Sequence, residues 1–363
     1  MSSRAERLAA DLRELQLDAL LVTEPTNVRY LTGYTGSNGL ALIVAEVDIP
    51  DRFYTDFRYG AQSAEQVPQA FEREITTSGD LLKAAAETLT GGNRSGRLGF
   101  EENHLTVKQH ARLGELVEQD WEPVGCAGVV ERLRAVKDQH EIELVRSSAQ
   151  LTDEVLRWIT EQGLAGRSEQ EVAVSLEHQM RVLGAQAPSF PSIVASGEHG
   201  ALPHAEPRNV EIPAGVLVTI DLGAILDGYC SDCTRTFATG DVPVEQREVY
   251  QLVLDAQIAG LEAVKPGSSG SEVDAVAREV IAEAGHSEHF GHGLGHGVGM
   301  EVHEGPRLSP TASDQPLQPG NVVTVEPGVY LPGAFGVRIE DLVLVTEQGC
   351  ERLSRFPKEL IVL

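Results

Sequence analysis

The chain has 363 residues, of which 41% are hydrophobic, and its 29 basic and 55 acidic residues give a formal net charge of −26. This length allows a large buried core and favours two domains over one. The strong negative charge, with no Lys/Arg-rich stretch to reverse it locally, argues against nucleic acid and anionic membranes as partners.

The start of the sequence and its cysteines indicate a cytoplasmic protein. No apolar run approaches the roughly 20 residues that span a bilayer, and the first residues lead into a charged helix pattern rather than a signal sequence. Four scattered cysteines are too few for a disulfide framework. Cys230 and Cys233 have the C-x-x-C spacing, but no second such pair completes a zinc site, so we expect buried small residues.

Residues 1–130 are expected to form an α/β domain. A helix is predicted over 4–16, a strand over 19–22, a turn-rich stretch over 32–39 and an apolar strand over 40–45. Strand and helix patterns continue to about residue 120. The segment 123–139, which contains Pro123, Gly125 and Gly128, is interpreted as the connection to a second domain over 131–363.

In the second domain, the predicted elements occur twice in the same order. Helices over 141–162 and 168–183 precede strands, and helices over 245–264 and 271–284 again precede strands. Ser168 with Glu171, and Ser271 with Asp274, have the spacing of a helix capping box. The second of these helix starts follows the first by 103 residues.

Two apolar strands carry one carboxylate each at matching positions. Asp221 lies within 218–223, and Glu326 lies within 323–328, 105 residues later. A charge in a buried strand is costly unless it is paired or binds a metal. Because the two offsets are similar, we favour a duplicated unit over chance similarity, with pseudo-twofold packing that brings the two strands together.

The first of these strands is predicted to form a hairpin. Asp227-Gly228 is a strong two-residue turn signal between strands over 215–226 and 229–237. This turn places Asp232 opposite Gly223 and diagonal to Asp221, so both carboxylates point to one side.

The second half repeats this arrangement with glutamates. Glu326 and Glu340 are symmetric about residue 333, in strands over 321–331 and 336–345 that flank a turn at 332–335. Four carboxylates at close range raise one another's pKa values unless cations compensate their charge. Two divalent cations would provide that compensation.

Histidines gather in the glycine-rich segment 290–303, which contains His292, His296 and His303. Imidazole together with carboxylates suits manganese, cobalt, iron or zinc. A flexible glycine loop with surface histidines is the alternative interpretation, and it explains three histidines within fourteen residues less well.

These residues resemble the five metal ligands of the pita-bread metallopeptidases, the group of aminopeptidase P, Xaa-Pro dipeptidase (prolidase) and methionine aminopeptidase. The matching ligand positions are Asp221, Asp232, His296, Glu326 and Glu340. The surrounding stretches 202–205, 228–237, 303–304, 326–328 and 337–341 are similar to the same group. The resemblance is strong from about residue 140 to the C-terminus and looser over the N-terminal domain, where 27–33 and 55–59 look like the proline-specific members.

The resemblance implies an α+β protein. A C-terminal pita-bread domain with pseudo-twofold duplicated halves would follow a smaller α/β domain of the creatinase type. It also implies two divalent metal ions per subunit, Mn2+ first and Co2+, Zn2+ or Fe2+ as alternatives, a peptide substrate with proline in second position, and a homodimer.

The resemblance also assigns roles to the site residues. Glu326 would be general base as well as metal ligand, while His303 and His204 would stabilise the tetrahedral oxyanion. His292 would line the proline pocket. Arg338 would lie beside the metal centre, and Arg307 corresponds to a substrate-carboxylate arginine of some prolidases.

Three functions are compatible with the sequence. Methionine aminopeptidases generally lack the N-terminal domain, so the length favours the Xaa-Pro branch. Within it, the stretch 32–39 favours an Xaa-Pro aminopeptidase, which removes the first residue from longer peptides, and a prolidase restricted to dipeptides is the alternative. A metal-free pita-bread module that only binds peptides is a remote third, because all five ligand positions are filled.

Overall fold

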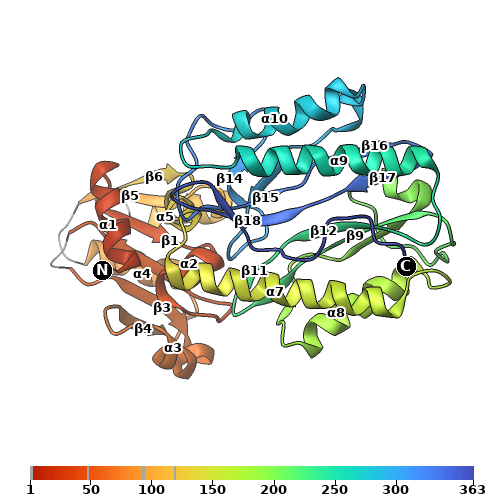
Figure 1. Cartoon of the computed structure of the whole chain (residues 1–363). Helices are drawn as coiled ribbons and strands as arrows, with labels where there is room; N and C mark the ends of the chain where they lie inside the picture. The colour runs from red at the N-terminus through yellow and green to blue at the C-terminus, as the bar shows by residue number, and fades with distance from the viewer. Residues whose placement is uncertain (1–2, 47–48, 92–94, 118–119) are drawn as a thin grey trace. The chain divides into compact units, whose positions relative to one another are not determined.

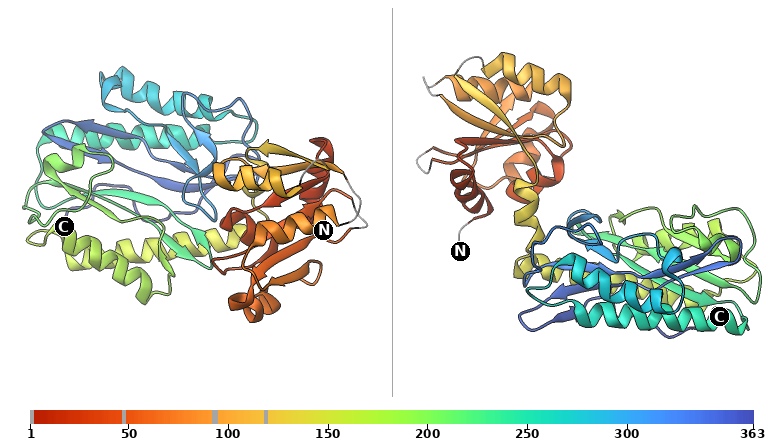
Figure 2. Two further views of the ribbon diagram at one scale, coloured as in Figure 1. Left: turned by 180° about the vertical axis from the view of Figure 1, so that it is seen from behind. Right: turned by 90° about the horizontal axis from the view of Figure 1, so that it is seen from above.

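The computed structural model describes residues 3–46, 49–91, 95–117 and 120–363. The chain divides into two compact units, Met1–Arg134 and Ala135–Leu363 (Figures 1 and 2). Among the described residues, no helix is both long enough and apolar enough to cross a membrane.

Unit 1 is built on a mixed sheet with the strand order β4-β3-β2-β1-β5-β6. Its strands are β1 Ala19–Val22, β2 Leu40–Val44, β3 Arg52–Asp56, β4 Glu72–Thr76, β5 Gly96–Glu101 and β6 Trp121–Cys126. Its helices are α1 Arg4–Glu14, α2 Pro25–Thr32, α3 Gly60–Gln66, α4 Leu81–Thr90, α5 Val107–Val117 and α6 Val129–Ala135. The apolar faces of β1, β2, α4 and α5 pack into one core, as expected for an α/β domain.

One sequence prediction in unit 1 is wrong. Pro123 and Gly125 do not lie in a connecting segment but in β6, which pairs in parallel with β5 from Gly96↔Trp121 onward. Proline is tolerated there because β6 is the edge strand, so the missing N–H breaks no ladder on its free side. The buried Trp121 ties this strand to the core.

Unit 2 contains two halves with the same order of elements. The first half has α7 Gln139–Gln162, α8 Glu169–Val182, β7 Ala187–Pro188, β8 Ile193–Ser196, β9 Leu217–Leu222, β10 Ala224–Leu226, β11 Tyr229–Cys230 and β12 Cys233–Ala238. The second half has α9 Val244–Ala263, α10 Gly270–Glu283, β13 Gly295–Gly297, β14 Glu304–Leu308, β15 Val322–Val325, β16 Gly328–Leu331, β17 Phe335–Arg338, β18 Asp341–Val345 and β19 Cys350–Arg352.

Sheet topology supports the duplication. The neighbouring strands β12-β9-β8 of the first half correspond to β18-β15-β13 of the second. Helix α9 begins 105 residues after α7, and β15 begins 105 residues after β9. In Figure 1 the strands of unit 2 run between the helix pair α7 and α8 and the helix pair α9 and α10.

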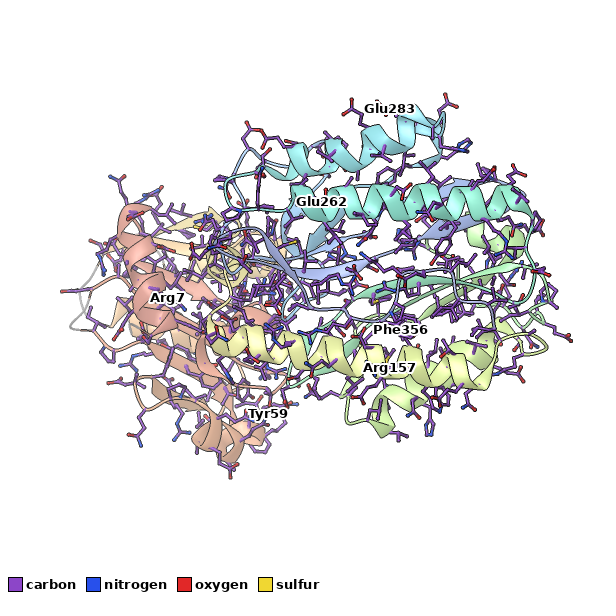
Figure 3. All side chains as sticks on the ribbon, in the orientation of Figure 1. Arg7, Tyr59, Arg157, Glu262, Glu283 and Phe356 are labelled. Atoms are coloured by element: carbon purple, nitrogen blue, oxygen red, sulfur yellow. The ribbon has the colours of Figure 1, made fainter. Side chains whose placement is uncertain are left out.

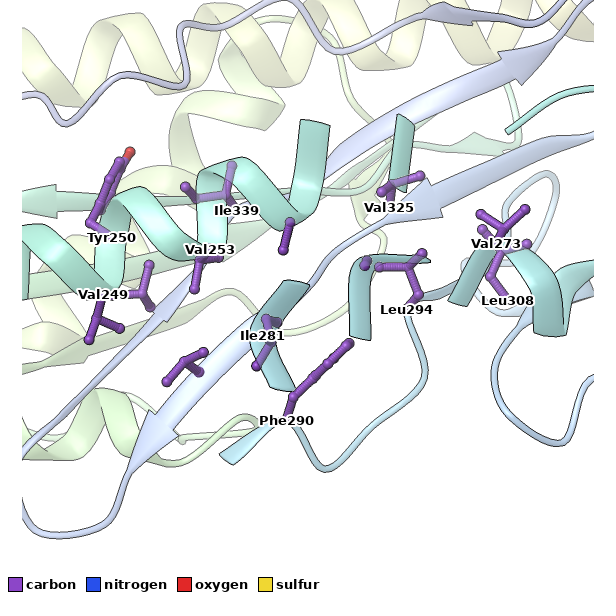
Figure 4. Packing of buried hydrophobic residues seen from close by; sticks show 14 of the residues in the cluster. Val249, Tyr250, Val253, Val273, Ile281, Phe290, Leu294, Leu308, Val325 and Ile339 are labelled. Atoms are coloured by element: carbon purple, nitrogen blue, oxygen red, sulfur yellow. The ribbon is translucent and has the colours of Figure 1, made fainter. Parts of the chain in front are cut away.

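Each helix pair packs on the strands of its own half. Valines and leucines of α7 and α8 form a core with β8, β9 and β12, while α9 and α10 form another with β15 to β18. Figure 4 shows this second core, which includes Val253 of α9, Ile281 of α10, Val325 of β15 and Ile339. The outer helix faces carry exposed charges such as Arg157 and Glu283 (Figure 3).

The helix starts are set by capping boxes, one of which differs from the prediction. Ser168 and Glu171 cap α8 reciprocally, as expected. At α10 the box is formed by Ser269 and Glu272, two residues before the predicted pair. Asp274 is instead buried within the helix, where it makes contacts described below.

The first hairpin has the predicted register. Leu226 pairs with Tyr229 across Asp227 and Gly228, whose positive φ angles of 50° and 83° are those of a type I′ turn. The same register continues with Asp221 opposite Thr234. The predicted strands are nevertheless broken, at Gly223 on one side and before β12 on the other.

The second hairpin also keeps its predicted symmetry but is interrupted. Val325 pairs with Asp341 in one ladder, and Gly328 pairs with Arg338 in the next. Each expected strand is therefore two strands, with Glu326-Pro327 in one break and Ile339-Glu340 in the other. A proline cannot donate to the ladder, which explains the first break.

A candidate metal centre between the two halves

Side chains from both halves of unit 2 converge on one group of donor atoms. Asp232, His296 and Glu340 each offer a ligand atom, and these atoms all lie within 4.8 Å of one another. Asp232 directly precedes β12, His296 lies in β13, and Glu340 directly precedes β18. Strand ends and breaks thus place the donors, because a carboxylate there is free of the ladder and can turn toward the seam.

His296 is oriented as a metal ligand requires. Its Nδ1 lies 3.1 Å from the Gly297 carbonyl, so Nδ1 carries the hydrogen and Nε2 has the free lone pair. Nε2 lies 3.3 Å from Glu326 Oε1 and 3.6 Å from Asp232 Oδ2. Burial lowers the pKa of His296 to about 4, so the imidazole is neutral at neutral pH.

Glu326 joins the group through Thr324. The Thr324 hydroxyl donates to Glu326 Oε1 at 3.2 Å and accepts from the His296 backbone N–H at 3.0 Å. Thr324 therefore fixes the carboxylate of Glu326, directly after β15, relative to His296 in β13. Glu340 is held in the same way by the first half, because the Thr234 hydroxyl donates to its Oε2 at 2.7 Å.

Asp221 lies beside these donors and is paired with Arg338. The Arg338 Nη2 donates to Asp221 Oδ2 at 2.8 Å, and both side chains are largely buried. Asp221 Oδ1 is buried without a hydrogen-bond partner among the described residues. A buried carboxylate oxygen without a partner is costly, and a cation is the partner that suits it.

The carboxylates repel one another in this buried position. Burial, then the negative charges of Glu340 and Asp221, raise the pKa of Asp232 well above its usual range. Burial and neighbouring carboxylates likewise raise the pKa of Glu340, and they raise that of Glu326 to about 8 despite the opposing charge of Arg338. The group holds more acids than it can ionise alone, which is the chemistry of a site built for divalent cations.

The structure also shows where the other predicted residues lie. His292 Nε2 lies 2.9 Å from the Tyr330 hydroxyl, and burial lowers the pKa of His292 to about 4. The exposed His303 has its ring 4.3 Å from that of His296. Burial and then the charge of the exposed His204 lower the pKa of His303, so these two histidines lie near each other.

Arg307 lies on β14 with an exposed side chain. Its charge contributes to the lowered pKa values of His296 and His303, so it lies near these two histidines. Arg307 is therefore near the site without belonging to its buried part.

Sequence reasoning missed Tyr330, which connects two predicted residues. Its hydroxyl accepts from Arg338 Nη1 at 2.9 Å and donates to His292 Nε2. Strand alternation was the available signal, because residues 326, 328 and 330 share one face when side chains alternate. Sequence reasoning also missed two threonines. Thr234 lies two residues after Asp232, and Thr324 lies two residues before Glu326.

Comparisons with known proteins identify the family and the fold. Residues 143–347 match the metallopeptidase family M24, and residues 4–136 match the creatinase/prolidase N-terminal domain. The chain is 36% identical to the Xaa-Pro dipeptidase of Pyrococcus furiosus over 364 residues, covering 99% of this chain and 100% of that protein.

Solved structures are similar over the same extent. An Xaa-Pro dipeptidase from Bacillus anthracis has a TM-score of 0.94 at 40% identity, with 99% of each chain covered. An X-Pro aminopeptidase from Thermotoga maritima has a TM-score of 0.90 at 36% identity, with 99% of this chain and 100% of that chain covered.

Proposed function

Because the chain belongs to metallopeptidase family M24, we propose that it is an Xaa-Pro dipeptidase that hydrolyses the bond between the first residue and a C-terminal proline. The main observation that supports this proposal is the convergence of carboxylates from both halves on His296. The aminopeptidase activity that the sequence favours is not confirmed. The dipeptidase alternative has better support, from relatives with that name that match along almost the whole chain.

We propose that five side chains hold two divalent cations, with Mn2+ as the first candidate: Asp221, Asp232, His296, Glu326 and Glu340. The unpartnered Asp221 oxygen and the raised pKa values of the buried acids support this assignment. Such cations supply an acidified water and polarise the scissile carbonyl. Their binding would displace the protons that the acids hold in the metal-free protein.

Glu326 is the proposed general base. Its carboxylate takes a proton from the attacking water, whose oxygen bonds to the carbonyl carbon, and passes that proton to the proline nitrogen as the C–N bond breaks. Thr324 fixes the carboxylate for both transfers. We propose that the exposed His303 and His204 donate to the oxyanion that forms between these steps.

Arg338 and Arg307 have separate proposed roles. Arg338 neutralises Asp221 from within the protein and so orients that carboxylate. Arg307 has an exposed side chain, which can pair with the free carboxylate of a dipeptide's proline. A dipeptide carries that carboxylate directly on the proline, whereas a longer peptide carries it further away.

Hydrolysis of Ala-Pro compared with Ala-Pro-Ala, each with Mn2+, tests the proposal. We expect kcat/KM for the dipeptide to be at least about tenfold higher, because only the dipeptide engages Arg307. Arg307→Ala should remove most of that preference by raising KM for Ala-Pro. Faster cleavage of the tripeptide would identify an aminopeptidase instead, and Glu326→Gln is the inactive control.

Two further assignments belong to the proposal. All four cysteines are free thiols, which suits the reducing cytoplasm. The homodimer rests on the family resemblance, and analytical ultracentrifugation of the purified protein would test it.

A further inference from the structure

An ion pair on α10 lies outside the donor group and is used by none of the steps above. Asp274 and Arg278 are four residues apart, and Arg278 Nε and Nη2 donate to the two carboxylate oxygens of Asp274 at 2.8 Å each. Asp274 is only 1% exposed. An ordinary helix pair at this spacing is solvent-exposed and contributes little, so this burial requires another explanation.

The remaining hydrogen bonds of the pair go to the backbone of residues 290–294, which we call the His292 loop. Arg278 donates to the carbonyls of Phe290 and His292 at 2.8 Å each, and the Leu294 N–H donates to Asp274 Oδ1 at 2.9 Å. The guanidinium also lies 4.2 Å from the centre of the Phe290 ring. Residues 290–294 belong to no strand, and besides these bonds the Leu294 carbonyl accepts from the Glu326 backbone N–H at 2.8 Å.

The loop in turn determines where the His292 ring lies. Nδ1 of His292 is 2.8 Å from the Gly293 carbonyl and therefore carries the hydrogen. Nε2 accepts from the Tyr330 hydroxyl, which itself accepts from Arg338. The Phe290 ring meets the imidazole edge-to-face at 5.1 Å. The Phe290 ring and the backbone that carries His292 therefore depend on the segment that Asp274 and Arg278 hold, whereas Tyr330 lies on β16.

The proposed ligand His296 lies two residues after the His292 loop and is held by separate contacts. Its backbone N–H donates to Thr324, and the neighbouring glycines pair with β14 and β15. A displacement of the His292 loop would thus move His292 more than His296. This difference allows substrate recognition and metal binding to be separated by experiment.

The first half uses the equivalent helix in a related way. Glu169 at the start of α8 is fully buried and accepts from Ser196, His199 and Arg208, which bracket the segment that carries His204. Each of the two corresponding helices therefore commits one buried carboxylate to a histidine-bearing segment.

We propose that Asp274 and Arg278 are positioning residues that set the proline specificity of the enzyme by holding the His292 loop. The inference rests on the proposed function and on the role that the family resemblance implies for His292, which is to line the proline pocket. The pair touches neither substrate nor cations and acts only through the loop.

Steady-state kinetics with Ala-Pro and Mn2+ test the proposal in Arg278→Leu and Asp274→Asn. Arg247→Leu on α9, whose partner Asp241 is exposed, is the matched control. We expect KM to rise about tenfold in both variants with kcat within about threefold, as displacement of a recognition group predicts. The Mn2+ dissociation constant, measured by calorimetry, should stay within about twofold.

An unchanged KM, or an Mn2+ affinity that falls as much as KM rises, would overturn the proposal. Arg278→Lys should restore little, because an ammonium cannot span the carboxylate and two carbonyls. If Arg278→Leu does not fold, Asp274→Asn replaces it as the test variant, because asparagine keeps an acceptor oxygen for the Leu294 N–H.

Hydrogen exchange of the wild-type and variant proteins provides a readout that does not need activity. Peptides that cover 290–296 should exchange at least about tenfold faster in Arg278→Leu than in wild type or Arg247→Leu. Exchange at the wild-type rate would refute the positioning role. If wild-type protein fails to cleave Ala-Pro, the proposed function falls, while this exchange result still decides whether the pair holds the loop.

Discussion

The two halves of unit 2 share an architecture but contribute different chemistry to the site. The first half supplies two aspartates on a hairpin closed by a two-residue turn. The second supplies two glutamates, the imidazole of His296 and the guanidinium of Arg338. Among these groups the first half brings only carboxylates, while the second also brings a cation and a neutral ligand. Neither half alone contains a complete donor set, although each has its own core.

Removing one carboxylate from either half should have the largest effect. Asp232→Asn and Glu340→Gln should each lower kcat for Ala-Pro by about 1000-fold or more and weaken Mn2+ binding, because both halves share one site. Neither change should lower the melting temperature of metal-free protein, since each replaces a buried acid that is already hard to ionise. Retention of a tenth of wild-type activity by one variant alone would mean that the halves act separately.

Loss of Arg338, which pairs with Asp221 across the two halves, should have the next largest effect. Arg338→Leu leaves Asp221 buried without its charge partner, and we expect kcat/KM to fall about 10- to 100-fold. Tyr330 also loses its donor, which should loosen His292. Arg352→Leu in the same half is the exposed control, and equal losses in both variants would argue against a special role for Arg338.

Acid should affect the first half through Glu169. Burial opposes its ionisation, but hydrogen bonds from Arg208 and Ser196 lower its pKa to about 2, from a usual value of 4.5. Because the native pKa is depressed, the stabilisation is complete above about pH 4.5 and is lost as pH falls toward 2.

The variant Glu169→Gln isolates this contribution. We expect it to lose about 2 kcal/mol at pH 7, where charged hydrogen bonds are intact, and the gap to wild type should close as the pH falls from 4.5 to about 2. Melting temperature measured against pH checks this. A gap that stays constant over that range would show that the carboxylate charge is irrelevant.

The smallest effects are expected at the hairpin turns, where the halves differ in loop length. Gly228 and Gly333 have φ angles of 83° and 75°, which cost an alanine about 1–2 kcal/mol of folding stability. Urea unfolding of Gly228→Ala and Gly333→Ala measures this cost. Activity should stay within about twofold in both, and a larger loss only in Gly228→Ala would show that the tighter turn fixes the aspartates.

Family, fold class and enzyme class were predictable from the sequence, and all three are confirmed. The reason is visible in particular residues. Asp227-Gly228 fixes one register through turn geometry, and the symmetry of Glu326 and Glu340 about residue 333 fixes the other, so both hairpin registers were predicted correctly.

Pro327 marks one strand break in the sequence, but the breaks at Gly223 and Glu340 could not be predicted. Alternation continues across Gly223 and Glu340, and only the three-dimensional structure shows that the ladders stop there. A Cβ at Gly223 would lie 2.0 Å from the Ser231 carbonyl oxygen, so the close approach of two backbones causes the first break. Such an approach leaves no signature beyond the glycine itself.

Burial of isolated polar groups was equally hidden. The Ser271 and Asp274 spacing satisfies the capping rule, yet Ser269 and Glu272 satisfy it as well, and only the packing of Asp274 against the His292 loop decides between them. Tyr330 was missed because an apolar strand accommodates a tyrosine without any sign that its hydroxyl has partners.

Calorimetric titration of chelator-treated protein with Mn2+, followed by Ala-Pro hydrolysis at each point, tests the central claim most directly. A site shared by the two halves predicts two ions bound per chain, with activity absent at the start and recovered as the ions bind. Full activity in the metal-free protein would contradict this claim. So would a failure to bind Mn2+, or Mn2+ binding that Glu340→Gln leaves unchanged.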